Sequence, residues 1–283
     1  RINVLSEIPE AWHAEVRRWS RINAPLKQNG APDANEELLI YQTLVGAGEI
    51  EAERLTSFLE KAAREAKTHS SWLAPNEEYE NALKEFGTAI LAHGPFLERF
   101  RRFHKRIAVH GMLNALAQVV VKTCSPGVPD FYQGTELWDF SLVDPDNRRP
   151  VDYEERASSL RALPPPATLL RNWRDGRVKL FVTSRSLAAR ARFADAPYVA
   201  IETTTPSAFA FQRGENALIV VPRLTTRVTK APSLPLGDAW QEHAVNVNGS
   251  WRNVFTGEVV EGESLPLREV FATFPVAIFE RVS

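Results

Sequence analysis

Residues 125–153 constrain the architecture more than any other part of the chain. They read Ser125-Pro-Gly-Val-Pro-Asp-Phe-Tyr-Gln-Gly-Thr-Glu-Leu-Trp-Asp-Phe-Ser-Leu-Val-Asp-Pro-Asp-Asn-Arg-Arg-Pro-Val-Asp-Tyr153. The first half predicts a short buried strand, Gly127 to Tyr132, that follows an apolar helix and enters a polar loop. The second half mixes acids, arginines and aromatic rings, namely Asp139, Asp144, Asp146, Arg148, Arg149 and Asp152 with Trp138, Phe140 and Tyr153.

The residue types of this loop favour a carbohydrate site. Planar rings stack on the apolar faces of sugars, and carboxylates and guanidinium groups match sugar hydroxyls. A second interpretation is a capped surface loop whose charges pair with one another, because Asp, Pro and Asn are ordinary turn residues. Composition alone favours the second interpretation.

The 120 residues upstream predict helices. Apolar side chains at helical spacing favour helices over residues 10–19, 35–45, 50–68, 76–91 and 94–122. Asp33 is the expected N-cap of the second of these helices. Charged residues vanish from Met112 to Val121, which predicts that this part of the last helix is buried on all sides.

The residues downstream first predict helices and then strands. Helices are expected over 153–162, 167–173 and 178–193. From about Pro197 the pattern changes to short strands separated by turn signals, over 198–203, 208–212, 217–222, 245–248, 251–255 and 276–281. This spacing is typical of an antiparallel sandwich.

A family resemblance adds to this interpretation. Gly127-Val-Pro-Asp-Phe-Tyr-Gln-Gly-Thr-Glu136 resembles the eighth-strand motif of the α-amylase superfamily, glycine-x-proline-x-x-tyrosine-x-glycine-x-glutamate. Further segments resemble one member of that family, and the resemblance runs from residue 1 to the last strand. These segments are Asn3-Val-Leu-Ser-Glu-Ile-Pro9, Gly30-Ala-Pro-Asp-Ala-Asn-Glu-Glu37, Tyr41-Gln-Thr-Leu44, Ala66-Lys-Thr-His-Ser-Ser-Trp72 and the continuation from Leu137 to Tyr153.

The resemblance implies an α/β fold, in which the chain is a fragment of a TIM barrel followed by an all-β domain. Residues 1–20 and 105–195 would form the closing part of a catalytic (β/α)8 barrel. Residues 21–104 would form a helical insertion. Residues 196–283 would form a C-terminal β-sandwich domain.

The resemblance also implies an activity. The family uses a retaining mechanism, and the member in question converts the reducing-end α-1,4 linkage of maltooligosaccharides to an α,α-1,1 (trehalose) linkage. The implied partners are a maltooligosaccharide substrate and the N-terminal portion of the same enzyme. Two alternatives stay open: another α-glucan hydrolase or transferase of the family, and a non-catalytic carbohydrate-binding protein.

No catalytic residue is assigned within the chain. It begins at Arg1 and has a single methionine, Met112, so we expect it to be part of a longer polypeptide. The family's three catalytic carboxylates would then lie upstream. We therefore expect the isolated chain to be inactive.

The resemblance implies substrate-binding residues in three segments. Tyr132, Gln133 and Glu136 would line the pocket at the top of strand eight. The loop that shapes the subsites would contribute Asp144, Asp146, Arg148 and Arg149. His69 and Trp72 would contact substrate from a pocket lid that also contains Ser71, and packing at a helix end within the insertion is the simpler alternative for these residues.

Composition excludes several other function classes. A formal net charge of −1 gives no overall attraction to nucleic acid or to an anionic membrane. The single cysteine allows no disulfide framework and fits a cytoplasmic location. The six histidines are scattered without metal-ligand spacing, so no metal and no cofactor are expected. No apolar run was expected to be long enough to span a membrane.

Overall fold

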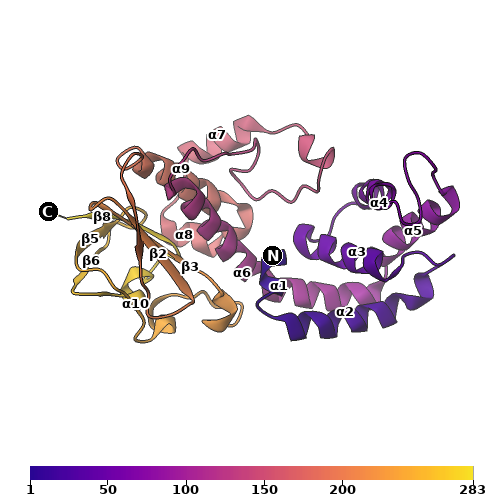
Figure 1. The fold of residues 1–283 in the computed structure, drawn as a ribbon, viewed down its shortest axis with the longest axis horizontal. Helices are drawn as coiled ribbons and strands as arrows, with labels where there is room; N and C mark the ends of the chain where they lie inside the picture. The colour runs from indigo at the N-terminus through magenta and orange to yellow at the C-terminus, as the bar shows by residue number, and fades with distance from the viewer. Residues whose placement is uncertain (283) are drawn as a thin grey trace. The chain divides into compact units, whose positions relative to one another are not determined.

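The computed structural model describes residues 1–282, which form two compact units (Figure 1). Unit 1 consists of residues 1–108 and 140–150, and unit 2 consists of residues 109–139 and everything from residue 151 onward. The long helix α6 (Gly94–Cys124) contributes its first half to unit 1 and its second half to unit 2. The predicted division into a barrel part and an insertion stays a prediction.

Unit 1 is helical, as the spacing of its apolar residues predicts. Its elements besides α6 are α1 (Ile2–Leu5), α2 (Pro9–Asn23), η1 (Ala24–Leu26), α3 (Ala34–Ala47), α4 (Ala52–Ala66), α5 (Glu77–Ile90) and η2 (Asp146–Arg148). The predicted N-cap of α3 is confirmed. Asp33 accepts hydrogen bonds from the backbone N–H groups of Asn35 and Glu36, each at 2.9 Å, and the Glu36 carboxylate accepts from the Asp33 N–H at 3.0 Å. This reciprocal capping box satisfies donors that the first turn leaves free.

The core of unit 1 is built around one indole ring. Trp19 is fully buried, and its ring centroid lies 5.4 Å from that of Tyr41, 5.6 Å from that of Phe96 and 5.5 Å from that of Phe103. These contacts are edge-to-face, the arrangement that the charge distribution of aromatic rings favours. Helices α2, α3 and α6 are therefore packed together through a single aromatic cluster.

Unit 2 combines helices with antiparallel sheet. Its helical elements besides α6 are α7 (Tyr153–Arg161), α8 (Pro166–Arg171), η3 (Trp173–Asp175), α9 (Arg177–Arg190), η4 (Thr225–Arg227), η5 (Gly237–Trp240) and α10 (Leu267–Val270). The strands are β1 (Tyr198–Ile201), β2 (Ala208–Arg213), β3 (Ala217–Pro222), β4 (Ala244–Val245), β5 (Gly249–Asn253), β6 (Val259–Gly262), β7 (Leu265–Pro266) and β8 (Ala277–Arg281). One antiparallel sheet has the order β1-β2-β3-β8-β5-β6, and β4 pairs with β7 in a second.

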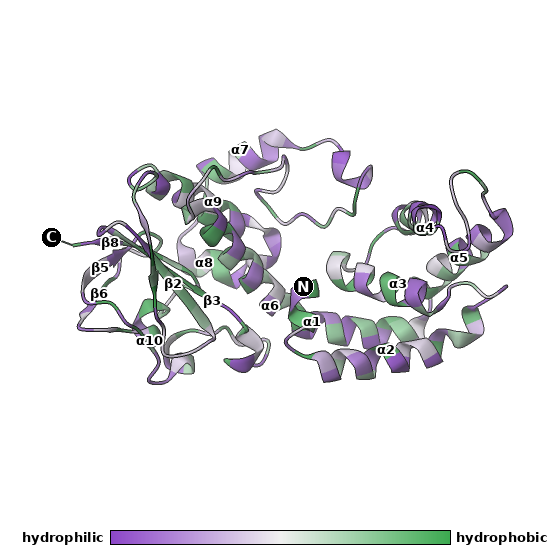
Figure 2. Cartoon of the chain, viewed as in Figure 1, coloured by the Kyte–Doolittle hydropathy of each residue, from purple (hydrophilic) through white to green (hydrophobic). Residues whose placement is uncertain are grey.

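The predicted sandwich of two sheets is confirmed only in part, because the second sheet consists of the two short strands β4 and β7. Side chains alternate along β3, so that Ile219 joins a core formed with α6, α8 and α9, while Leu218 joins a core that contains Trp240 and Phe271. Figure 2 shows the apolar residues along β2 and β3. One face of the large sheet is thus covered by helices instead of a second large sheet, because the apolar faces of α6 and α9 pack there.

The predicted strand over Gly127 to Tyr132 is also wrong for this chain. The described residues 127–132 form no strand, and Val128 is 96% exposed. Gly127 has φ of +95°, outside the range of extended backbone. A strand is stable only when neighbouring strands accept and donate its backbone hydrogen bonds, and all described sheet residues lie after residue 197.

The expectation that no segment is apolar enough to cross a membrane is wrong for α6. This helix contains an 18-residue window with a mean hydropathy of 1.3, which is sufficient by length and composition. However, 72% of that window is buried inside the protein. Core helices of soluble proteins have the same composition, so this helix is weak support for a membrane span.

Candidate functional site

The nine predicted substrate-binding residues lie in both units. Unit 1 holds His69 and Trp72 on the loop between α4 and α5, together with Asp144, Asp146, Arg148 and Arg149 in the loop at 140–150. Unit 2 holds Tyr132, Gln133 and Glu136 in the segment that follows α6. Their predicted role in binding a sugar stays a prediction, and the contacts below describe each group within its own unit.

Asp146 is the anchor of the loop at 140–150. Arg54 of α4 donates to both of its carboxylate oxygens, from Nε to Oδ1 at 3.0 Å and from Nη2 to Oδ2 at 2.9 Å. The Leu142 N–H also donates to Oδ2, at 2.6 Å. The hydrogen bonds from Arg54 are the main cause that lowers the pKa of Asp146 from its ordinary value of 3.8. Asp146 therefore carries its charge at neutral pH and holds the loop against α4.

Asp144 and the two arginines differ in how firmly they are held. Lys61 of α4 donates to the Asp144 backbone carbonyl at 2.6 Å. Arg148 pairs with the Asp144 carboxylate, but its own side chain is 70% exposed. Arg149 donates from Nε to the Asp146 carbonyl at 3.0 Å. The loop thus presents one tethered arginine and one that is largely free to meet solvent.

A cavity of about 280 Å³ lies between this loop and α4. Its apolar wall is made by Phe58, Leu142, Val143 and Pro145. Its polar lining includes Arg54, Lys61, Asp144, Asp146 and Arg149. An apolar wall with converging charged groups suits a small polyhydroxy ligand, because it offers both a stacking surface and hydrogen-bonding partners.

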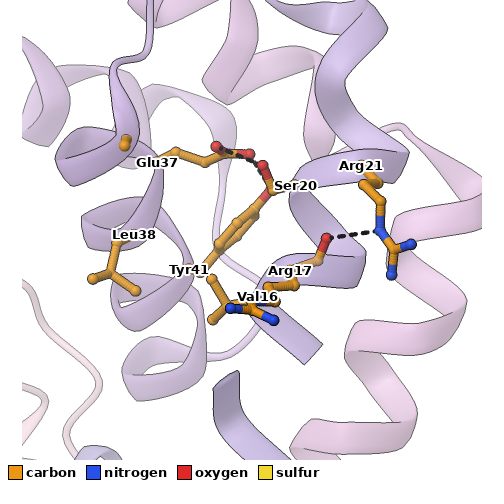
Figure 3. A pocket seen from close by; sticks show the side chains of 8 residues that line it. Val16, Arg17, Ser20, Arg21, Glu37, Leu38 and Tyr41 are labelled. Carbon is orange, nitrogen blue, oxygen red and sulfur yellow. Dashed lines mark hydrogen bonds between the residues drawn. The ribbon is translucent and has the colours of Figure 1, made fainter. Parts of the chain in front are cut away.

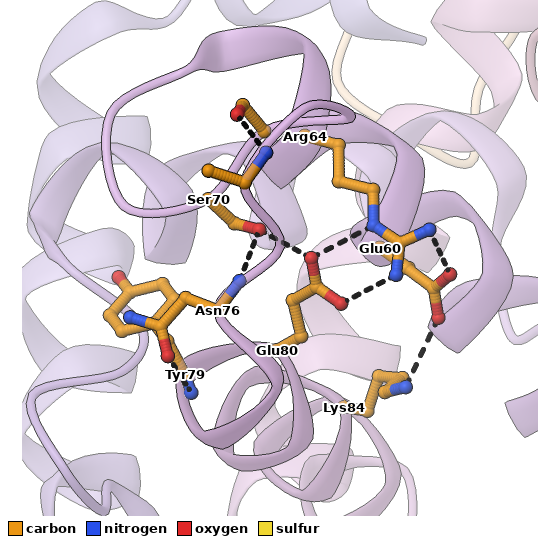
Figure 4. A network of polar contacts seen from close by, with 9 residues as sticks. Glu60, Arg64, Ser70, Asn76, Tyr79, Glu80 and Lys84 are labelled. Atoms are coloured by element: carbon orange, nitrogen blue, oxygen red, sulfur yellow. Dashed lines mark hydrogen bonds and ion pairs between the residues drawn. The ribbon is translucent and has the colours of Figure 1, made fainter.

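The loop between α4 and α5 is held from below by a buried carboxylate (Figure 4). Glu80 is 2% exposed and accepts from Arg64 Nε at 2.8 Å and from Arg64 Nη2 at 2.7 Å. It also accepts a hydrogen bond from Ser70 Oγ, and Ser70 Oγ accepts one from the Asn76 N–H at 3.0 Å. The Trp72 ring is 56% exposed, and the Arg64 guanidinium lies 5.0 Å from its centroid. The loop is therefore fixed at its base while it presents an aromatic ring to solvent.

His69 belongs to a cluster that the spacing of histidines and carboxylates did not predict. Its Nε2 lies 2.9 Å from Asp33 Oδ2, and its ring stacks on Tyr79 with centroids 4.4 Å apart. Among residues 1–282, Asp33, Glu36 and His69 bring three possible ligand atoms within 4.8 Å of one another, so this cluster could hold a metal ion. Asp33 and Glu36 also form the capping box of α3, and the Tyr79 hydroxyl donates to Glu36. The contacts already present account for these carboxylates without an ion.

In unit 2, Arg156 of α7 organises the segment that follows α6. Its Nε lies 3.0 Å from the Glu136 carboxylate, and its Nη2 donates to the Gly134 carbonyl at 2.9 Å. Gln133 accepts from the Tyr153 hydroxyl at 3.2 Å. Tyr132 is 46% exposed, which makes its ring accessible. The carboxylate of Glu136 is thus engaged by an arginine, whereas Tyr132 is the more available partner for a ligand.

A second, more open cavity of about 510 Å³ lies between α2 and α3 (Figure 3). Its floor contains Glu37, which accepts from Ser20 Oγ at 3.0 Å, from Lys27 Nζ at 2.8 Å and from the Tyr41 hydroxyl at 2.7 Å. Burial is the first cause that raises the pKa of Tyr41 well above its usual range, so its hydroxyl stays protonated. Asn23 continues this network by donating to the Tyr41 oxygen at 2.9 Å. These groups satisfy one another, and no ligand is needed to explain their burial.

The residues that the sequence did not identify are mostly the basic side chains that hold the candidate residues in place. Arg54, Lys61, Arg64 and Arg156 were not predicted to contribute to a site. Each lies on a charged helix face that reads as ordinary solvated surface. Only the contacts of Arg54 and Lys61 with residues more than eighty positions away reveal their role.

Comparisons with known proteins agree on one enzyme. No protein-family profile matches the chain. A Mycobacterium tuberculosis protein described as a maltooligosyl trehalose synthase is 35% identical over 99% of this chain, and the match spans 35% of that protein. The structure of maltooligosyltrehalose synthase from Arthrobacter ramosus is 31% identical, with a TM-score of 0.79 over 99% of this chain and 36% of its own. A further crystal structure of a maltooligosyl trehalose synthase is 28% identical, with a TM-score of 0.81 over 99% of this chain and 37% of its own.

These matches extend over both units, and they cover the helical part as completely as the sheet. The chain spans about a third of the length of the relatives that it matches. Sequence identity and fold both point to maltooligosyl trehalose synthases. Along 99% of its length, the chain is therefore a homologue of a C-terminal part of the maltooligosyl trehalose synthases.

Proposed function

We propose that this chain is part of an intramolecular transglucosylase that converts the reducing-end α-1,4 linkage of maltooligosaccharides to an α,α-1,1 linkage. The observation that carries the proposal is the match to maltooligosyl trehalose synthases over 99% of the chain, with the same fold. The contacts of the loop at 140–150 support it, because they hold charged groups beside a cavity of about 280 Å³.

In this proposal the chain supplies substrate-binding residues and the catalytic carboxylates belong to the N-terminal portion of the enzyme. A retaining reaction needs a nucleophilic carboxylate and an acid/base carboxylate roughly 5–5.5 Å apart. Among the nine candidate residues, the carboxylates of Asp144, Asp146 and Glu136 are each paired with an arginine. Paired carboxylates suit positioning better than nucleophilic attack, because their oxygens are already engaged by an arginine.

The segment Gly127 to Tyr132 is proposed to become a barrel strand beside strands from the N-terminal portion. Its exposed Val128 and accessible Tyr132 fit a segment that has further partners in the complete enzyme. Residues just past the end of such a strand face the reaction in barrel enzymes. Tyr132, Gln133 and Glu136 would then reach the pocket. The enzyme is proposed to be cytoplasmic.

The test is the reaction of maltopentaose with the complete enzyme and, separately, with the purified 283-residue chain. We expect the complete enzyme to form a product that ends in trehalose and the chain alone to form none. Release of glucose or maltose as the main product by the complete enzyme would favour a glucan hydrolase instead. Binding of maltopentaose without any conversion by the complete enzyme would favour a non-catalytic carbohydrate-binding protein.

A further inference from the structure

Helix α4 contacts both loops of unit 1 that carry candidate substrate-binding residues. Arg54 and Lys61 bind the loop at 140–150. Arg64, one helical turn beyond Lys61, binds the base of the loop at 67–76 through Glu80 and Ser70. On the basis of the proposed function, we propose that α4 is a positioning helix, in which Arg54 and Arg64 set the two loops against the substrate.

The contacts of Arg54 show why an arginine is needed at this position. Its guanidinium makes the two-pronged contact with Asp146 and also donates from Nη2 to the Phe140 carbonyl at 3.0 Å. The Arg54 and Asp146 side chains are only 18% and 15% exposed. A planar fork fixes both the distance and the orientation of a carboxylate, which the single ammonium of a lysine cannot do.

Arg64 performs the same task for the other loop. Its Nε and Nη2 donate to the two Glu80 carboxylate oxygens, and Glu80 in turn accepts a hydrogen bond from the Ser70 hydroxyl (Figure 4). The same guanidinium lies 5.0 Å from the centroid of the exposed Trp72 ring. A single side chain therefore connects the base of the loop to its aromatic tip.

The helix is rigid enough to act on both loops together. Arg54 and Lys61 are seven residues apart, so they share one face of a helix with about 3.6 residues per turn. The opposite side of α4 buries Leu55, Leu59 and Ala63 in the core of unit 1. A helix whose core face is packed holds its outer residues in a fixed arrangement, which is how precise binding sites are supported.

The experiment uses the complete enzyme and the variants Arg54→Ala, Arg54→Lys and Asp146→Asn. Arg101→Ala is the matched control, because Arg101 makes an equally two-pronged contact with Glu49, at 2.7 and 2.6 Å, but touches neither loop. The first readout is the kcat/KM for maltopentaose. The second is the ratio of trehalose-ended product to released glucose, which does not depend on the amount of folded enzyme. The third is hydrogen exchange over residues 140–150.

We expect Arg54→Ala to lower kcat/KM about 10- to 1000-fold and to shift the product ratio toward glucose, because a displaced loop lets water compete with the sugar acceptor. Arg54→Lys should restore only part of the rate. If Arg54→Ala does not fold, we expect Arg54→Lys and Asp146→Asn to lower kcat/KM and to shift the product ratio toward glucose as well.

An unchanged product ratio in the Arg54 and Asp146 variants would overturn the inference, whether or not exchange over 140–150 rises. An equal shift in Arg101→Ala would overturn it as well. A wild-type enzyme that forms no trehalose-ended product would instead refute the proposed function. In that case faster exchange over 140–150 would still establish that Arg54 holds the loop.

Discussion

The loop at 140–150 and the start of the segment at 125–136 are close neighbours in the sequence, yet they are held by different groups. The main anchor of the loop is a side-chain carboxylate, Asp146, bound by Arg54 and by the Leu142 N–H. The start of the segment is held through its backbone, because Arg190 donates to the carbonyls of Ser125 and Gly127, and to that of Thr123 in α6.

This difference shows which polar groups of the motif find bonding partners within their own unit. Arginine and lysine side chains are long, so they can reach a carboxylate on a neighbouring element. Backbone N–H and C=O groups need partners of fixed geometry, and a strand finds them only on neighbouring strands. The charged half of the motif is therefore ordered by α4 within unit 1, whereas the strand half leaves Val128 almost fully exposed.

The largest expected effect is on the loop. Asp146→Ala removes the acceptor for Arg54 and for the Leu142 N–H, and it leaves the Arg54 guanidinium without its carboxylate. We expect the free energy of opening residues 140–150 to fall by about 1.5–3 kcal/mol, the range for hydrogen bonds to charged groups. Hydrogen exchange over this loop measures the change. Residues 125–136 should keep their exchange rates, and faster exchange in both segments would break the distinction between them.

The converse change should loosen the segment alone. Arg190→Ala removes three hydrogen bonds to carbonyls around the end of α6, two of them at 2.6 and 2.9 Å. We expect a cost of about 1–2 kcal/mol, because solvent replaces part of each lost bond. Exchange should rise from residue 121 to residue 128 and remain unchanged over 140–150. Arg171→Ala is a suitable control, since Arg171 donates to the hydroxyl of Thr168, three residues before it.

Sequence patterns predicted the features that depend on neighbours along the chain. The N-cap of α3 follows from the position of Asp33, and the buried part of α6 follows from its lack of charges. The strands β2 and β3 were predicted almost to the residue, because their alternation and the turn between them are local signals. In each case the physical cause lies within about one helical turn or one hairpin.

The features that were missed depend on distant partners. The strand β6 (Val259–Gly262) carries one buried residue, Val260, so it has no visible alternation and exists because β5 pairs with it. The contact between Arg54 and Asp146 joins positions 92 residues apart, and no periodic pattern reports such a pair. The residues of the candidate loop could be named from the sequence, but the helix that holds them could not.

A smaller difference between the two regions is expected at low pH, where the loop at 140–150 should open more readily than residues 123–127. The pKa of Asp146 is lowered in the folded chain, so its contribution to stability is complete above the ordinary value of 3.8 and is lost as the pH falls through its lower folded value. We expect the opening of residues 140–150 to increase below pH 3.8, relative to its value at neutral pH. Asp146→Asn should remove this dependence. The carbonyls bound by Arg190 do not titrate, so residues 123–127 serve as the internal reference, and an equal acid response there would contradict the prediction.

The smallest expected effect distinguishes the two adjacent arginines of the loop. Arg149 donates to the Asp146 carbonyl at 3.0 Å and lines the cavity, whereas the Arg148 side chain is 70% exposed and pairs with Asp144, whose side chain is 46% exposed. Exposed ion pairs contribute about 0–1 kcal/mol, so Arg148→Ala should shift the melting temperature little. Arg149→Ala should shift it more, because a backbone tether of the loop is lost.

If substrate reaches this loop, Arg148 is the more exposed residue and can turn toward it, and its loss should lower kcat/KM more than it lowers stability. Identical changes in rate and melting temperature for both variants would contradict the prediction that Arg148 and Arg149 have different roles.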